Sequence, residues 1–332
     1  MAHITVDICT KDRYDQLPMA LMSVINQTRT PDKIIIYDDS STRIEMRETP
    51  IYQHLFDLIN TKRIEFEVIY GLGRGQHWGH QMIQDKATDL VWRIDDDEVA
   101  EPTVLQILEL RMLNGVGAVA GLVIPPGTIK QDFPPNTIKN IDNGNCQWFY
   151  WPNSDIKEVE HLYSSYLYRK GIQEFDLSLS CVAHREETLH TYGIYRKGYK
   201  LIVDPAAVTY HFRASTGGIR ASGQKEDWDR DEIAYRETLR EYEGHKICYL
   251  DSGMGDHIVF RSILPKIKEK YKDVVLAVCY PELFPGENCI SLAEGQKLCN
   301  PDRHNIFKYC IDKGWKDKEI KYAYAELYGV EI

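Results

Sequence analysis

Residues 90–98 read LVWRIDDDE, an apolar run that ends in four consecutive acidic side chains. The apolar part is typical of a buried strand, and the carboxyl ends of strands in an α/β sheet are where such proteins bind ligands. Carboxylates spaced as Asp95 and Asp97 are hard oxygen ligands that suit Mg²⁺ or Mn²⁺, ions that keep positions open for diphosphate oxygens. The stretch predicts a metal-held nucleotide, although the same acids also suit the start of a helix near Pro102.

The residues before this stretch alternate between strand-like and helical patterns. Strands are expected at residues 4–9, 33–37 and 64–70, with one helix at 17–25 and another that reaches Ala87. Strands that alternate with helices predict a parallel sheet with right-handed crossovers. Each strand is followed by polar residues. At one edge of the sheet we therefore expect to find together Thr10, Arg13, Asp39, Arg74 and Asp95.

An ordered series of segments carries a family resemblance. The segments are 6–13 (VDICTKDR), 20–28 (ALMSVINQT), 34–41 (IIIYDDSS), 94–98 (IDDDE), 180–185 (SCVAHR) and 198–211 (GYKLIVDPAAVTYH). Together they resemble the inverting glycosyltransferases of family two, whose catalytic domain is the Rossmann-like α/β GT-A fold. By that resemblance, 94–98 corresponds to the family's DxD motif, 180–185 to an acceptor-side strand that enters a helix, and 198–211 to the segment that closes the domain with a histidine.

The resemblance implies a role for each polar residue. Asp39 would bind the nucleotide base, Asp95 would contact the ribose, and Asp97 with His211 would hold Mn²⁺ or Mg²⁺. His211 is a weaker ligand than Asp97 because hard cations prefer oxygen, and it would otherwise be a strand-end histidine that bonds a backbone carbonyl. The residues expected on the nucleotide side are Thr10, Arg13, Asp39, Arg74, Asp95 and Asp96.

Transfer of a sugar from a nucleotide also requires positive charge around the leaving diphosphate, which the metal and arginine side chains provide. Arg74, Arg213 and Arg220 are candidates, the last two beside the glycine-containing stretch 215–218. This stretch would close on the diphosphate after binding, or it is a solvated loop.

An inverting transfer needs a carboxylate base near the acceptor hydroxyl. Family members place an acidic pair between the acceptor-side helix and the segment at 198, but this chain has only TYGIYRK at 191–197. We name Asp176 and Asp227 as substitutes. Each also has a structural interpretation, Asp176 as a turn residue and Asp227 as part of the acidic first turn of a helix.

Composition limits the classes of partner. The formal net charge is −10 over 332 residues, which disfavours nucleic acid and anionic membranes because both are polyanions. The eight cysteines include no CxxC pair and are expected to be reduced thiols. No apolar stretch is long enough to span a bilayer and no signal peptide precedes the first strand, so a cytoplasmic protein is expected.

Gly244 marks the expected domain boundary, with a GT-A catalytic domain at 1–243 and a small α/β accessory domain at 244–332. The second domain should contain a βαβ unit, with strands at 246–250 and 274–280 around a helix. About 40 residues there resemble the opening of heptosyltransferase-like GT-B enzymes, which suggests a truncated half-domain. Its role is structural or oligomerising, or it binds a ligand through the glycine turn at 252–256.

The function expected from these observations is that of a metal-dependent glycosyltransferase. It would move a monosaccharide from a nucleoside-diphosphate sugar, with a UDP-sugar favoured, to a hydroxyl of a glycan or glycolipid precursor. Two alternatives remain open at this point. One is a non-catalytic protein that binds nucleotide sugars or serves as a scaffold, because the acidic pair is missing. The other is a glycosyltransferase that acts on modified DNA.

Overall fold

A computed structural model of the protein describes residues 2–124, 155–212, 214–315 and 319–332. The chain forms two compact units, Met1–Gln224 and Lys225–Ile332. Within the described ranges, no helix combines the length and apolar character that crossing a lipid bilayer requires.

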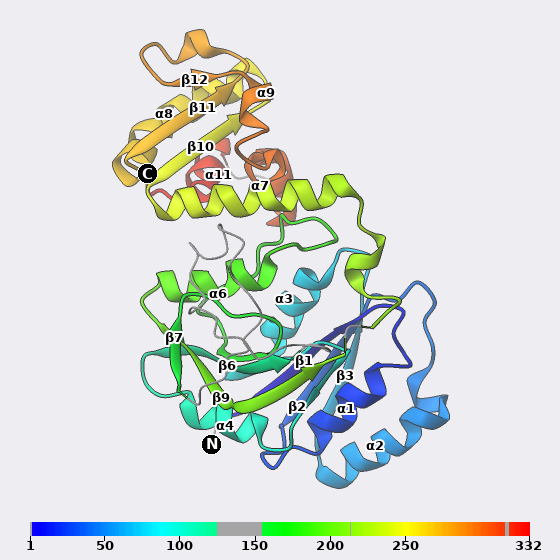
Figure 1. The fold of residues 1–332 in the computed structure, drawn as a ribbon. Coiled ribbons are helices and arrows are strands. Elements are labelled where there is room, and N and C mark those ends of the chain that lie inside the picture. The colour runs from blue at the N-terminus through cyan, green and yellow to red at the C-terminus, as the bar shows by residue number, and fades with distance from the viewer. Residues whose placement is uncertain (1, 125–154, 213, 316–318) are drawn as a thin grey trace. The chain divides into compact units, whose positions relative to one another are not determined.

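The first unit is built on a mixed sheet with the strand order β3-β2-β1-β4-β8-β6-β9-β5, in which β7 also pairs with β9 (Figure 1). The strands are β1 (Ile4–Thr10), β2 (Lys33–Asp38), β3 (Glu65–Tyr70), β4 (Leu90–Arg93), β5 (Glu98–Ala100), β6 (Val116–Ile124), β7 (Lys157–Val159), β8 (Tyr166–Arg169) and β9 (Lys200–His211). The pairs among β1 to β4 are parallel, as the sequence predicted, whereas β8 is antiparallel to both of its neighbours.

Helices cover both faces of this sheet. They are α1 (Leu17–Ile25), α2 (Pro50–Lys62), α3 (Gln76–Lys86), α4 (Val104–Arg111) and α6 (Glu186–Arg196). Figure 1 shows α1, α2 and α4 on one face and α3 and α6 on the other. In β2, Ile34 and Ile36 pack in the core beside α1 and α2, whereas Ile35 belongs to the core on the opposite face. β2 is therefore apolar on both faces, which is why it reads as a continuous hydrophobic run.

The prediction of an acceptor-side strand at residues 180–185 is wrong, because these residues form turns. Ala183 and Arg185 have φ angles of 51° and 68°, in the left-handed region that an extended strand cannot contain. The helix expected after them is present as α6, so the turns position the first residues of α6 rather than extending the sheet.

The second unit contains a three-stranded parallel sheet in the order β10-β11-β12. Its elements are α7 (Lys225–Tyr242), β10 (His245–Leu250), α8 (Met254–Lys270), β11 (Asp273–Val278), β12 (Cys289–Ile290), α9 (Leu292–Gly295), α10 (Ile306–Asp312) and α11 (Ile320–Leu327). The expected βαβ unit is β10-α8-β11. Phe260 of α8 and Tyr324 of α11 pack together in the core of this unit.

The boundary between the units lies before α7 rather than at residue 243. Glu237 of α7 is almost fully buried and ion-pairs with Arg303 at 3.0 Å and His304 at 2.7 Å. These partners lie in the second unit, so α7 belongs to it. The charged composition of α7 resembled a solvated terminal helix and did not reveal this buried side.

Candidate functional site

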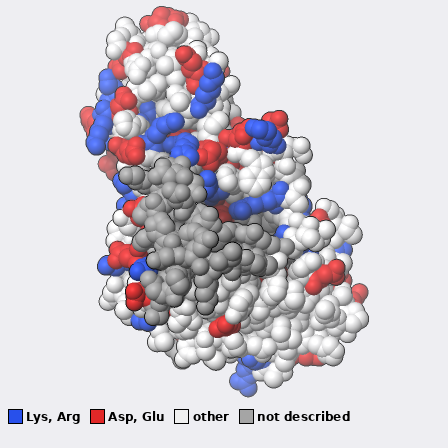
Figure 2. Space-filling model, in the orientation of Figure 1, with Lys and Arg blue, Asp and Glu red and all other residues white. Residues whose placement is uncertain are grey.

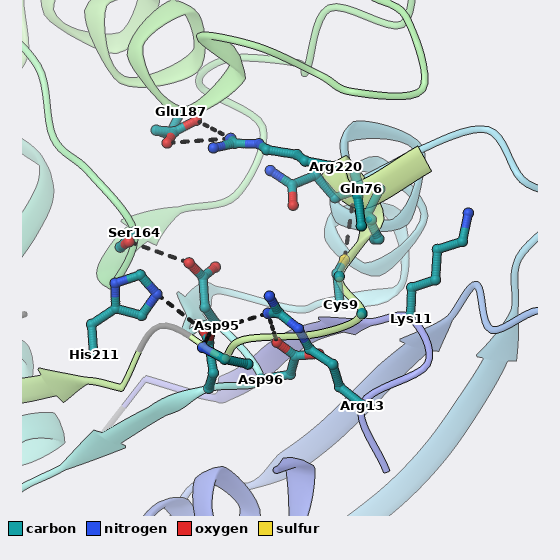
Figure 3. Close-up of a pocket in the computed structure, with 16 residues that line it drawn as sticks. Cys9, Lys11, Arg13, Gln76, Asp95, Asp96, Ser164, Glu187, His211 and Arg220 are labelled. Carbon is teal, nitrogen blue, oxygen red and sulfur yellow. Dashed lines mark hydrogen bonds and ion pairs between the residues drawn. The ribbon is translucent and has the colours of Figure 1, made fainter. Parts of the chain in front are cut away.

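A pocket of about 400 Å³ lies in the first unit where β1 and β4 end (Figure 3). Lys11 and Arg13 follow β1, the acids Asp95, Asp96 and Asp97 follow β4, and Glu187 belongs to the first turn of α6. The loop at 214–221, which follows β9, lines another part of the pocket. The parallel strands end at one edge of the sheet, and their polar termini meet there.

Asp95, Asp97 and His211 form a cluster in which one ligand atom from each residue lies within 4.8 Å of the others. The sheet explains how His211 reaches the acidic run. β5 pairs antiparallel with the end of β9, and Glu98 lies opposite His211 in that register. His211 Nε2 lies 3.1 Å from Asp97 Oδ1. Two carboxylates with one imidazole are a ligand set that fits Mn²⁺.

The charges around this cluster favour a bound cation. Burial alone would lower the pKa of His211, but the hydrogen bond to Asp97 and the nearby negative charges of Glu98 and Asp95 raise it to about 9. Burial would also raise the pKa of Asp97, yet His211, the Ala214 amide and Arg13 lower it to about 2. The acids thus favour positive charge at this position, and a divalent cation, which His211 would bind through its neutral imidazole, would supply that charge in place of the proton.

Asp96, which stands between the two carboxylates of the cluster in the sequence, is held by residues at the end of β1. Its Oδ2 accepts a hydrogen bond from Thr10 Oγ1 at 2.7 Å, and its Oδ1 accepts one from Arg13 Nη1 at 2.8 Å. Arg13 Nη1 also lies 3.1 Å from Asp97 Oδ2. Burial raises the pKa of Asp96 to about 6, although Arg13 opposes this shift. The structure therefore brings together Thr10, Arg13 and the three aspartates, as the sequence predicted.

Asp39 and Arg74 are not among the residues that line the pocket. Asp39 is 5% exposed, and its Oδ1 accepts a hydrogen bond from the Gly73 amide at 2.6 Å. Among the described residues, none donates a hydrogen bond to Asp39 Oδ2. The backbone amide of Asp39 donates to the Thr10 carbonyl at 2.9 Å, which ties it to the end of β1. The guanidinium of Arg74 stacks on the ring of Trp78 at 4.6 Å.

The two residues named from the sequence as bases take other places. Asp176 is not among the pocket-lining residues, and its Oδ1 accepts hydrogen bonds from the Ser178 amide at 3.0 Å and the Ser178 hydroxyl at 2.5 Å. This is the geometry of an Asx turn. Asp227 lies in α7 of the second unit, where Arg230 is 3.7 Å from its carboxylate. Arg213, named for the diphosphate, lies outside the described residues.

Glu187 is the pocket carboxylate that sequence reasoning missed. It lines the pocket, and Arg220 Nη2 lies 3.1 Å from its Oε2. Its neighbour Glu186 is fully buried and pairs with Arg93 at 2.6 Å and with the Gln76 side chain at 2.8 Å. An acidic pair, absent from 191–197, therefore stands at the start of α6. The signal was in the sequence, where two glutamates precede a helical pattern.

A family model and solved structures match this chain. Residues 5–159 match the model of the family described as Glycosyl transferase family 2. A solved structure of GalNAc-T7 with UDP, GalNAc and Mn²⁺ is similar over 90% of this chain and 56% of that one, with a TM-score of 0.54 and 13% identity. S. aureus TarS is matched over 80% of this chain and 53% of that one, with a TM-score of 0.48 and 12% identity. No curated protein matches the sequence.

These findings confirm the resemblance to family two and the α/β GT-A fold of the first unit. The chain spans about half the length of the solved chains it resembles. The resemblance of the second unit to heptosyltransferase-like enzymes stays a prediction.

Proposed function

We propose that the first unit is a glycosyltransferase that depends on a divalent cation and transfers a monosaccharide from a nucleoside-diphosphate sugar to a hydroxyl acceptor. The observation that carries the proposal is the convergence of Asp95, Asp97 and His211 in one pocket at the carboxyl ends of the strands. The match of residues 5–159 to Glycosyl transferase family 2 supports the same reaction class.

The donor side is assigned as follows. Asp95, Asp97 and His211 would hold Mn²⁺ or Mg²⁺, which supplies positive charge for the oxygens of the leaving diphosphate. Arg13 fixes the orientation of Asp97 through their contact at 3.1 Å. Asp39 Oδ2, buried and without a donor among the described residues, would accept a hydrogen bond from the nucleotide base. An imide N–H such as that of uracil provides such a donor, and the UDP and Mn²⁺ in the GalNAc-T7 structure favour that choice.

Glu187 is assigned the acceptor side. In the view of Figure 3 it lies apart from Asp95 and Asp96, with the open pocket between them. A carboxylate there can take the proton from an acceptor hydroxyl while the diphosphate leaves on the metal side. Glu186 stays bound to Arg93 and holds the first turn of α6 in place.

A neutral glycan or glycolipid precursor is the acceptor class we propose. On the described surface that Figure 2 shows, basic and acidic side chains are interspersed. Together with the net charge of −10, this supports a carbohydrate acceptor over DNA, whose binding depends on patches of positive charge.

Turnover of a donor tests the proposal. UDP-glucose, UDP-galactose and their N-acetyl derivatives are incubated with Mn²⁺, and release of UDP is measured with and without added acceptors. We expect release by the wild type that EDTA abolishes, and a loss of roughly 10²- to 10³-fold or more in Asp97→Ala, because charge on the leaving group is then poorly stabilised. Equal release by Asp97→Ala would overturn the assignment.

A further inference from the structure

The guanidinium of Arg220 contacts both oxygens of Glu187. Arg220 Nη2 lies 3.1 Å from Oε2 and 3.5 Å from Oε1. Arg220 belongs to the short helix η2 (Ile219–Ser222), and Figure 3 shows its side chain pointing toward Glu187 inside the pocket. The Glu187 side chain is 13% exposed and that of Arg220 is 37% exposed, so both are accessible to a ligand in the pocket. The carboxylate that we assign as the base is thus paired with the guanidinium of Arg220.

The loop that carries Arg220 is fastened to the metal side of the same pocket. The Ala214 amide donates to Asp97 Oδ2 at 2.9 Å, and the Thr216 carbonyl accepts from Arg13 Nε at 3.2 Å. Gly217 and Gly218 have φ angles of 70° and 89°, and a Cβ on either would come within 2.6 Å of residues 12–13. Only glycine fits this close, left-handed passage. The loop therefore connects the cation-binding acids at one end to Glu187 at the other.

A diphosphate that enters this pocket would compete with Glu187 for Arg220. The guanidinium fork binds phosphate oxygens as well as it binds a carboxylate, and a diphosphate offers more negative charge. Arg13, which also lines the pocket, is already engaged by Asp96 and Asp97. Arg13 and Arg220 both line the pocket, but among the described residues only Arg220 has an ion-pair partner, Glu187, that lies outside the acidic run after β4.

On the basis of the proposed function, we infer that Arg220 moves from Glu187 to the diphosphate when the nucleotide sugar binds, and that Glu187 becomes an effective base only then. Arg220 is in this view a catalytic residue that touches the donor and a gate on the acceptor side. Glu187 then deprotonates the acceptor only when a donor is bound. When Arg220 moves from Glu187 to the diphosphate, one ion pair replaces another and no covalent bond is formed or broken.

The charges that face Glu187 agree with this exchange. Burial would raise the pKa of Glu187, but Arg220 first and Arg93 second lower it to about 2, with a smaller contribution from His184. A carboxylate with so low a pKa is a weak base. Arg93 is bound to Glu186 at 2.6 Å and is fully buried, so Arg220 is the partner that can leave. Its departure raises the basicity of Glu187.

A double-mutant cycle on nucleotide binding tests the inference without any acceptor. The dissociation constants of UDP and GDP, each with Mn²⁺, are measured by calorimetry for the wild type, Glu187→Gln, Arg220→Gln and the double variant. We expect Glu187→Gln to bind the nucleotide about tenfold more tightly, because Arg220 no longer has to leave a carboxylate, and Arg220→Gln to bind it more weakly. In the Arg220→Gln background, Glu187→Gln should change the constant by less than about twofold.

One control variant and two contrary results complete the test. Arg220→Lys keeps the charge, so Glu187→Gln should still tighten binding in that background. Because the key result is tighter binding, a misfolded variant cannot produce it. If Glu187→Gln tightens binding equally with and without Arg220, the effect is general repulsion and the exchange is overturned while the proposed function stands. If the wild type binds neither nucleotide with Mn²⁺, the proposed function fails and the exchange fails with it.

Discussion

Two charged clusters of the molecule use the same residue types in different ways. In the pocket of the first unit, Asp95, Asp97 and His211 converge in an open cavity, and Asp95 keeps a side chain that is 30% exposed. In the second unit, Glu237 is enclosed by Arg303 and His304, and its side chain is 2% exposed. The first cluster has an excess of acids, whereas in the second a single acid is matched by two basic side chains.

This difference separates a site for ligands from a structural ion pair. A buried carboxylate whose partners satisfy both oxygens holds elements together, and loss of one partner leaves an uncompensated charge. A cluster with excess negative charge next to a cavity is incomplete until a cation arrives. We therefore expect substitutions in the pocket to change chemistry more than stability, and substitutions at Glu237 to do the reverse.

The largest effect is expected for Glu187→Gln. Loss of a general base lowers the rate by roughly 10²- to 10⁴-fold, so transfer to an acceptor in saturating donor and Mn²⁺ should fall in that range. Asp176→Asn is the matched control because its carboxylate caps a turn, and we expect nearly wild-type transfer from it. The thermal midpoint of each variant is measured beside its rate. Normal transfer by Glu187→Gln, or a comparable loss in Asp176→Asn, would reverse the roles assigned to these two residues.

A smaller effect, on stability, is expected for Glu237→Gln. Burial would raise the pKa of Glu237, but Arg303 and His304 lower it well below its ordinary value of 4.5. The free energy of unfolding at pH 7 should fall on the order of 3 kcal/mol, since Arg303 is left without its carboxylate. A depressed pKa gives stability that is present above pH 4.5 and is lost as the pH falls below that value. The gap between wild type and variant should therefore shrink at pH 3.

Urea unfolding followed by circular dichroism at both pH values measures this gap. Asp229→Asn, on the same helix α7, is the control, because Asp229 pairs with Lys225 on the solvent side and should contribute nothing measurable. Mn²⁺-nucleotide binding by folded Glu237→Gln should match the wild type, since every residue that lines the pocket belongs to the first unit. A stability gap that is the same at pH 3 and pH 7 would contradict the role of this ion pair.

The same contrast explains which parts of the molecule could be predicted from sequence. The strands and the acidic run are local patterns, because β2 and β4 are mostly apolar runs that polar residues follow. His211 was found through the family resemblance, and its meeting with Asp97 depends on the pairing of β5 with β9. Glu187 was missed because the turns at 180–185 were taken for a strand, and the search for a base was placed at 191–197, in the second half of α6, instead of at its start.

The compact units divide at residue 224 rather than at the expected residue 243 for a related reason. A helix as rich in charge as α7 is usually solvated, and nothing in its spacing shows that Glu237 is buried against residues more than 60 positions away. Partners that are distant in the sequence leave no local pattern. The placement of Asp39 and Arg74 outside the pocket lining is likewise a property of the loops after β2 and β3 rather than of any motif.

The central claim is that Asp97 and His211 bind a divalent cation that anchors a nucleoside diphosphate. Electron paramagnetic resonance of Mn²⁺, titrated with protein in the presence of UDP, measures this directly. The account predicts that the wild type binds a single ion per chain, that Asp97→Asn and His211→Ala lose it, and that Asp176→Asn retains it. Binding of Mn²⁺ by Asp97→Asn and His211→Ala as tight as in the wild type, or no binding by the wild type, would contradict the account.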